Sequence, residues 1–224
     1  MANVSKRRER DPAVAARLPA GQEVTAKWPV LHYGSVPRVD LATWDFHVTG
    51  LVEQPVRFTW DEFMALPQTR RHNDIHCVTR WSKLDNEWEG VVVLDLMNKV
   101  TLRPEARAVL VHAGYPRSGS GFTANLLLND FLREENLFAH SHDGRPLEPE
   151  HGYPLRLVVP HLYFWKSVKW VRGLEFLAQD QPGFWERNGY HNDGDPWTEQ
   201  RTHEDPMAFR TLRRRARGVD DPDT

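Results

Sequence analysis

The sequence predicts an α+β domain, and three observations support this fold class. Several short runs alternate apolar and polar side chains or are rich in β-branched residues, as strands are. The helical patterns between them are brief, and the strand–helix alternation of a doubly wound sheet does not recur. The 224 residues can form one large domain, and 40% apolar content with nine tryptophans supplies its core.

The first expected elements follow one another from residue 44. Residues 44–48 alternate apolar and polar side chains and predict a half-buried strand. Thr59 and Glu62 form a capping-box pattern, and Pro67 stops the chain beyond it. We therefore expect a short helix over about residues 60–66.

Later elements are predicted by the same criteria. Helical spacing predicts a helix over 93–100, and Asn129 or Asp130 can cap another through Arg133. Asp143-Gly144 predicts a hairpin turn. Strands are expected over 108–113, 155–160 and 171–177. A basic, aromatic stretch over 163–170 connects the last two of these strands.

The two ends differ from the middle of the chain. Residues 1–27 are polar without periodicity and predict a mobile arm, followed by a domain over 28–200 and a charged tail over 201–224. No apolar segment follows the basic N-terminus, so no secretory signal is expected. Apolar runs such as 90–94 are far shorter than the roughly 18 residues of a membrane helix. With one unpaired cysteine, this indicates the cytoplasm and no membrane contact.

Charge gives little indication of a polyanionic partner. The net charge of −2 argues against a general nucleic-acid binder. Arginines gather over residues 210–217 of the tail, beside an acidic end that can neutralise them. We favour a solvated extension, with a nucleic-acid-binding module as the alternative.

Cys77 is the only cysteine, which excludes an intrachain disulfide, haem attachment through two cysteines and cysteine-ligated iron–sulfur clusters. It lies among His72, His76 and Arg80. Cations and imidazoles favour the thiolate, which is both a nucleophile and a soft metal ligand. The alternatives are a buried, inert thiol and a zinc site built from His72, His76 and Cys77.

Two further segments are suited to an anion. Arg156 begins an apolar strand behind His151, and a cation in a core strand should meet a carboxylate or a phosphate. Lys166 and Lys169 flank Ser167 in a segment whose backbone N–H groups and charges together can hold phosphate.

Three segments resemble those of the sulfite oxidase-like molybdopterin-dependent oxidoreductases, a family that includes bacterial methionine-sulfoxide reductases. The first is Asp74-Ile75-His76-Cys77-Val78-Thr79-Arg80-Trp81-Ser82-Lys83-Leu84, with Trp88 and Gly90 following. The second is Gly152-Tyr153-Pro154-Leu155-Arg156-Leu157-Val158-Val159-Pro160, followed by Lys166-Ser167-Val168-Lys169. The third is Gly183-Phe184-Trp185-Glu186-Arg187-Asn188-Gly189-Tyr190-His191, and the resemblance covers about residues 28–200.

The resemblance implies the sulfite oxidase molybdenum-domain fold, with mixed sheets and short helices, and one molybdenum–molybdopterin per chain. It implies that Cys77 is the thiolate ligand of molybdenum. The implied cofactor contacts are Arg156, Ser167, Val168 and Lys169, with His151 beside them and Leu31, His32 and Ala113 more peripheral. An asparagine stands at the position of His151 in the methionine-sulfoxide reductases.

The same resemblance implies two-electron oxygen-atom transfer on a small S- or N-oxide or oxyanion substrate. A separate electron-transfer partner and a monomeric protein are expected with it. The methionine-sulfoxide reductases have Glu-Ala where this chain has Thr79-Arg80. Arg80 is therefore expected to act as a catalytic residue that favours an oxyanion. The alternative is that its side chain points away to a surface carboxylate.

Overall fold

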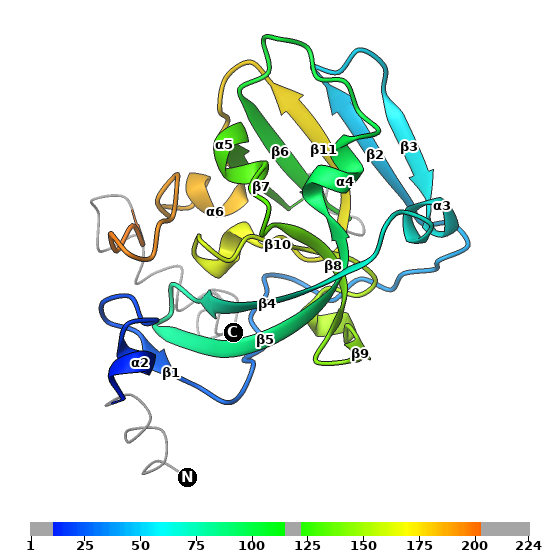
Figure 1. Ribbon diagram of the computed structural model, residues 1–224. Coiled ribbons are helices and arrows are strands. Elements are labelled where there is room, and N and C mark those ends of the chain that lie inside the picture. Colours follow the sequence, from blue (N-terminus) through cyan, green and yellow to red (C-terminus); the bar gives the residue numbers. More distant parts are fainter. Residues whose placement is uncertain (1–10, 115–121, 203–224) are drawn as a thin grey trace, which may run out of the picture.

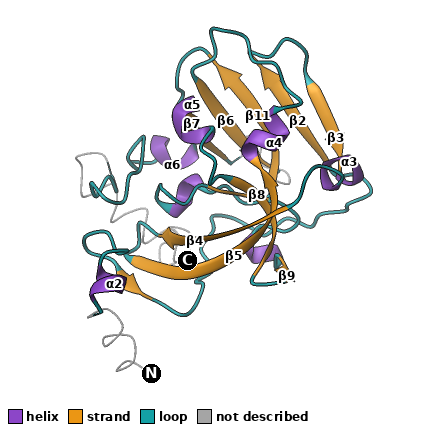
Figure 2. Cartoon of the chain, viewed as in Figure 1, coloured by secondary structure: helices purple, strands orange, loops and turns teal. Residues whose placement is uncertain are grey.

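Two mixed β-sheets form the framework of residues 11–114 and 122–202, the part of the chain that the computed structural model describes (Figure 1). Short helices lie around the sheets rather than alternating with the strands (Figure 2). This arrangement confirms the predicted α+β class.

The five-stranded sheet has the order β3-β2-β11-β6-β7. Its strands are β2 (Asp45–Gly50), β3 (Val56–Thr59), β6 (Ala108–Ala113), β7 (Thr123–Leu127) and β11 (Val171–Leu177). The predictions over 44–48, 108–113 and 171–177 are confirmed. Strands β2 and β11 run parallel and the other neighbours antiparallel, so distant parts of the chain meet at the sheet centre.

The six-stranded sheet has the path β1-β5-β8-β10, with β4 beside β5 and β9 beside β8. Its strands are β1 (Glu23–Val24), β4 (Thr69–His76), β5 (Trp81–Val92), β8 (Leu137–His142), β9 (Arg145–Pro146) and β10 (Arg156–Val158). The Asp143-Gly144 turn joins β8 to β9 as predicted, with both residues at positive φ. The β4–β5 hairpin was not predicted, and it presents Cys77 at its tip.

Each helix of the described residues is one or two turns long. They are α2 (Pro12–Ala15), α3 (Trp60–Met64), α4 (Val93–Met97), α5 (Leu128–Phe131), α6 (Phe184–Arg187) and the 3₁₀ turns η1 (Pro149–His151) and η2 (Phe164–Lys166). The predicted capping box of α3 is present, with Thr59 and Glu62 bonding each other's backbone N–H groups. The expected cap of α5 is wrong, because Leu127 occupies that position without a side-chain bond.

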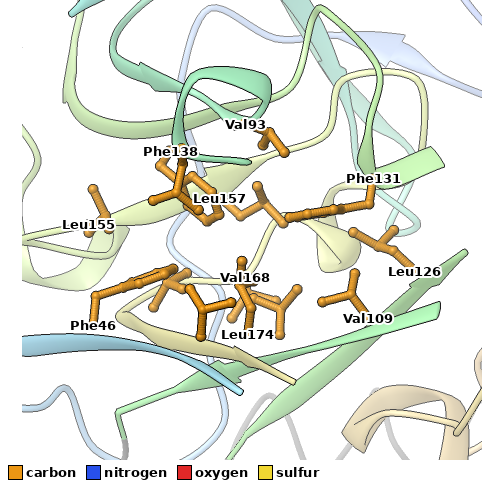
Figure 3. Close-up of a cluster of buried hydrophobic side chains, with 14 of the residues drawn as sticks. Phe46, Val93, Val109, Leu126, Phe131, Phe138, Leu155, Leu157, Val168 and Leu174 are labelled. Carbon is orange, nitrogen blue, oxygen red and sulfur yellow. The ribbon is translucent and has the colours of Figure 1, made fainter. Parts of the chain in front are cut away.

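The main core lies where the two sheets face each other. Figure 3 shows Phe138 and Leu157 on one side of it and Phe46, Val109 and Leu174 on the other. These side chains come from both sheets, and all are buried. The contact between the sheets therefore fixes β10 and the segment after it, which contribute to the site described below.

Parts of the predicted arm and tail form regular elements or contact the sheets. Residues 11–27 include α2 and β1, and β1 pairs in parallel with β5 at Trp81 and Ser82. Arg17 bonds both Asp74 and Asp85. Arg201, placed in the tail by the sequence, is buried. No element was predicted within residues 11–27, because a two-residue strand and a single ion-paired arginine leave no periodic pattern.

None of the described helices is both long enough and apolar enough to cross a bilayer.

Candidate functional site

A cavity of about 320 Å³ opens beside the tip of the β4–β5 hairpin. Four separate segments line it, from residues 28–33, 77–81, 151–170 and 185–190, together with Phe122. Most of the residues predicted for the site line this cavity, namely Leu31, His32, Cys77, His151, Arg156, Ser167, Val168 and Lys169. The fold therefore brings together segments that are far apart in the sequence.

Two predicted residues do not line the cavity. Ala113 is buried at the end of β6, and its N–H donates to the carbonyl of Phe122, which does line the cavity. Arg80 is exposed, and its guanidinium bonds the carbonyl of Gly21 at 3.5 Å instead. The catalytic position expected for Arg80 is therefore not the one that the structure gives it.

Cys77 begins the tight turn between β4 and β5. Its N–H donates to Trp81 O at 2.8 Å, and Arg80 N–H donates to Cys77 O at 3.0 Å. Arg80 closes the turn in the left-handed region, with φ of 76°. The side chain of Cys77 thus faces the cavity while that of Arg80 faces the other way.

The thiol of Cys77 is buried, and its Sγ lies 3.1 Å from Thr79 Oγ1. Burial raises the pKa of the thiol, while hydrogen bonding from Thr79 and the charge of Arg201 oppose that rise. A cation bound at Sγ would lower the pKa of the thiol and so favour the thiolate.

Both ends of the described chain hold the backbone of this turn, which we call the Cys77 turn (residues 77–80). Gln22 Nε2 donates to Cys77 O at 3.0 Å. The guanidinium of Arg201 donates to Val78 O at 2.8 Å and to Ala20 O at 3.0 Å. The Cys77 turn therefore depends on residues that the sequence placed in the arm and the tail.

We expect Arg201→Gln to lower the free energy of unfolding by about 1–3 kcal/mol, because the buried carbonyl of Val78 and the partly buried carbonyl of Ala20 lose a charged donor. Thermal denaturation measures this change. Arg80→Gln is the matched control, since that arginine is exposed and makes one long bond. Equal losses in the two variants would contradict the assigned role of Arg201.

One end of the cavity is cationic, and Arg156 is its centre. This residue is buried at the start of β10 between the rings of Trp28 and Phe164, with its Cζ 5.3 and 4.2 Å from their centroids. Its guanidinium donates to the backbone carbonyls of His151 and Ser167. Burial lowers the pKa of Arg156 to about 9, and no carboxylate of the described residues pairs with it. A buried cation in this position lacks an anion.

Lys169 lies at the same end. Its ammonium donates to Leu31 O and Glu150 O, both at 2.7 Å. Burial, followed by the charge of Arg156, lowers the pKa of Lys169 to about 7. His151 stacks on Trp28 at 3.8 Å, and burial lowers its pKa as well. This cationic end is suited to a phosphate group, whose charge would compensate Arg156 and Lys169.

The segment between these cations is only partly as predicted. Ser167 is buried, and its Oγ accepts a bond from Val159 N–H at 2.9 Å. Val168 contacts the main core and also lines the cavity, so it connects the two (Figure 3). Lys166, expected beside the anion, instead forms a buried ion pair with Glu186 at 2.7 Å.

The other end of the cavity is aromatic and contains Cys77. Trp165, Trp185 and Tyr190 pack with Cys77, and the two tryptophan rings each lie 5.0 Å from the tyrosine ring. No charged side chain lines this end within the described residues. These three residues were not predicted as site residues, although the density of aromatic residues over 163–170 and 184–190 was a signal.

The zinc alternative is not supported. His72 is exposed and lies near Glu87, whereas His76 is buried and bonds Ser82 Oγ at 2.8 Å. No group of three metal-binding side chains occurs in residues 11–114 and 122–202. The arginines of residues 210–217 lie outside the described residues.

Comparisons with known proteins agree with this geometry. The family model of the oxidoreductase molybdopterin binding domain matches residues 33–185. The uncharacterized oxidoreductase YuiH of Bacillus subtilis (strain 168) is 50% identical over 188 residues, which are 84% of this chain and 92% of that protein. The putative protein-methionine-sulfoxide reductase subunit YedZ1 of Azospira oryzae is 29% identical over 185 residues, covering 81% of this chain and 68% of that protein.

A solved structure shows the same fold. The sulfane dehydrogenase SoxCD from Paracoccus pantotrophus superimposes with a TM-score of 0.59 at 22% identity, covering 66% of this chain and 42% of that chain. The fold expected from the sequence is thus confirmed. The chain belongs to the oxidoreductase molybdopterin binding domain family and is a molybdopterin-dependent oxidoreductase of the sulfite oxidase-like type.

Proposed function

We propose that this enzyme catalyses two-electron oxygen-atom transfer on a small, neutral S- or N-oxide. The observation that carries the proposal is the division of the cavity into a cationic end and a neutral, aromatic end with Cys77. An oxyanion gains most from a cation beside the reacting atom, and Arg80 does not provide one there. Sulfur also makes favourable contacts with aromatic rings, which suits a sulfoxide.

The residues present fit molybdopterin at both ends of the cavity. Arg156 and Lys169 would hold its phosphate, with His151 and Ser167 beside them. Val168, Leu31 and His32 would line the wall of the cavity around it, and Ala113 would hold the cavity residue Phe122 through its backbone bond. Cys77 would be the thiolate ligand of molybdenum. When bound, the cofactor supplies a metal that exchanges two electrons and an oxygen atom with the substrate.

The protein's own contribution is binding and exclusion of water. In the reducing direction the S=O bond breaks, and the oxygen leaves as water with two protons while two electrons come from a donor. Cys77 is the only cysteine, so these 224 residues hold no cysteine-ligated iron–sulfur cluster. We therefore infer a separate electron-transfer partner.

Metal analysis and a substrate panel test the proposal together. We expect about one molybdenum per chain, as for one bound cofactor. With reduced viologen as donor, dimethyl sulfoxide and trimethylamine N-oxide should be reduced with a higher kcat/KM than nitrate or chlorate. Preference for the anions would overturn the neutral-substrate proposal, and zinc in place of molybdenum would overturn the cofactor assignment.

The charge of Lys169 predicts how cofactor retention depends on pH. With a pKa near 7 in the cofactor-free protein, Lys169 is protonated below pH 7 and loses its charge as the pH rises. We therefore expect molybdopterin uptake to be highest below pH 7 and to fall as the pH rises above it. Lys169→Arg should remove this fall, because arginine stays protonated throughout. The measurement is pterin content after equilibration of the cofactor-free protein at each pH. Parallel profiles in the two proteins would rule out Lys169 as the phosphate contact.

A further inference from the structure

A buried ion pair lies directly behind the aromatic end of the cavity. Lys166 and Glu186 are both almost fully buried, with Nζ and Oε1 2.7 Å apart. The ammonium also donates to Asn125 O and Asn125 Oδ1, each at 2.9 Å, so its three protons are used. Neither side chain lines the cavity.

The carboxylate of Glu186 has a second bond that reaches the cavity wall. The indole N–H of Trp165 donates to Glu186 Oε1 at 2.8 Å. Glu186 belongs to α6, which lies beside β7 (Figure 1), and follows Trp185 in the chain. One carboxylate therefore connects the two tryptophans of the aromatic end, one through a hydrogen bond and the other through the backbone.

The ion pair is a poor way to stabilise the fold. Moving two charges out of water costs free energy, and a well-packed apolar pair of the same volume often gives a fold that is equally or more stable. Oε2 of Glu186 has no hydrogen-bond partner in the described residues and sits where a side chain at position 183 would lie, 2.6 Å from the Cβ that Gly183 lacks. The buried position of the Glu186 carboxylate is better explained by the orientation that this carboxylate gives to Trp165.

We infer that Glu186, held in place by Lys166, is a positioning residue that fixes the indole of Trp165 in the cavity wall and so determines which oxides fit beside Cys77. This inference rests on the proposed function for its substrate, but not for the geometry of Trp165. The ring lines the cavity, stacks on Tyr163 and is bonded through its N–H to Glu186, so loss of the bond removes the polar contact that fixes its orientation against the substrate space.

Two double variants separate the acceptor from the charge. The first, Lys166→Met with Glu186→Gln (the Gln pair), removes the ion pair and keeps an oxygen that accepts from the indole. The second, Lys166→Met with Glu186→Leu (the Leu pair), removes both the ion pair and the acceptor. Thermal denaturation of both proteins checks that they are folded, and Trp165→Phe provides a second way to remove the same hydrogen bond.

The first readout is the indole N–H resonance of Trp165 in 15N-labelled protein, assigned by its absence in Trp165→Phe. We expect this proton to be protected from exchange in the wild type and in the Gln pair, and to exchange faster in the Leu pair. An unchanged resonance in the Leu pair would overturn the positioning role, whatever the enzyme's substrate is.

The second readout is selectivity between methyl phenyl sulfoxide and dimethyl sulfoxide. In the Leu pair the ratio of their KM values should change by about tenfold, the size of an effect from a misfitting pocket, and the Gln pair should keep the wild-type ratio. Equal ratios in both pairs would overturn the role in selectivity. If the wild type reduces neither sulfoxide, the proposed function and its selectivity both fail, and the indole resonance still decides the positioning role.

Discussion

Cys77→Ser is expected to reduce turnover by more than about 100-fold. Mutation of residues that only hydrogen-bond to the ligands of a metal already lowers activity by about 10- to 100-fold, and loss of a ligand should cost more. Serine replaces a soft sulfur with a hard hydroxyl oxygen, which does not ligate molybdenum as a thiolate does. The substitution is nearly isosteric, so the buried turn should keep its fold. Sulfoxide reduction, molybdenum content and the electron paramagnetic resonance signal of the metal are the measurements.

Thr79→Val is the matched control for this variant. It removes the hydroxyl 3.1 Å from Sγ while leaving the thiol in place. Its effect on turnover should therefore be smaller, and its resonance signal should shift less. Full activity with an unaltered signal in Cys77→Ser would exclude the thiolate from the metal site.

Arg156→Met is expected to weaken cofactor retention and yet to stabilise the cofactor-free protein. Desolvation of the buried charge costs several kcal/mol, more than its bonds to the carbonyls of His151 and Ser167 return, so the charge destabilises the fold until an anion binds. Methionine has a similar length and adapts to an irregular apolar site. Loss of the charge-assisted contact should weaken pterin binding by about 1.5–3 kcal/mol, or roughly 10- to 150-fold. Pterin content and thermal denaturation with and without cofactor measure both effects.

Arg172→Met is the control for that experiment. Arg172 forms an ion pair with Asp45 outside the cavity, so its loss should destabilise the protein without changing cofactor content. A variant at Arg156 that retains wild-type pterin would mean that this arginine is structural and that the phosphate lies elsewhere.

Local sequence patterns predicted the elements whose stabilising contacts are themselves local. The capping box of α3 and the Asp143-Gly144 hairpin each depend on residues within a few positions of one another. Strands β6 and β11 were predicted because both carry apolar runs buried in the main core. Their neighbours in the sheet were not predicted, since pairing of β11 with β2 joins residues about 126 positions apart.

The β4–β5 hairpin was missed for a physical reason. The first half of β4 is exposed or half-buried and carries arginine and histidine, so no apolar alternation marks it. What holds this strand is its ladder with β5 and the ion pair of Arg17 with Asp74. A reading of local hydrophobicity contains neither of these contacts.

The candidate site was predicted unevenly. Its cations were found because a charge in an apolar strand, as at Arg156, is conspicuous in the sequence. Its aromatic end was missed because tryptophans such as Trp165 are equally common in cores. The orientation of Arg80 follows from the left-handed backbone conformation that closes the Cys77 turn. The sequence gives no signal for this conformation at an arginine.

The attachment of the Cys77 turn to both ends of the described chain has a consequence for how the cofactor can leave. Arg201 and Val78 are 123 positions apart, and Gln22 and Cys77 are 55 apart. Fraying of a terminal segment is the least costly opening of a folded chain, and here it would release the turn while the two sheets stay packed. Amide hydrogens of the turn should therefore exchange by sub-global opening, faster than those of β11. Release of the cofactor would then follow local opening of the contacts that Gln22 and Arg201 make with the turn, and not global unfolding.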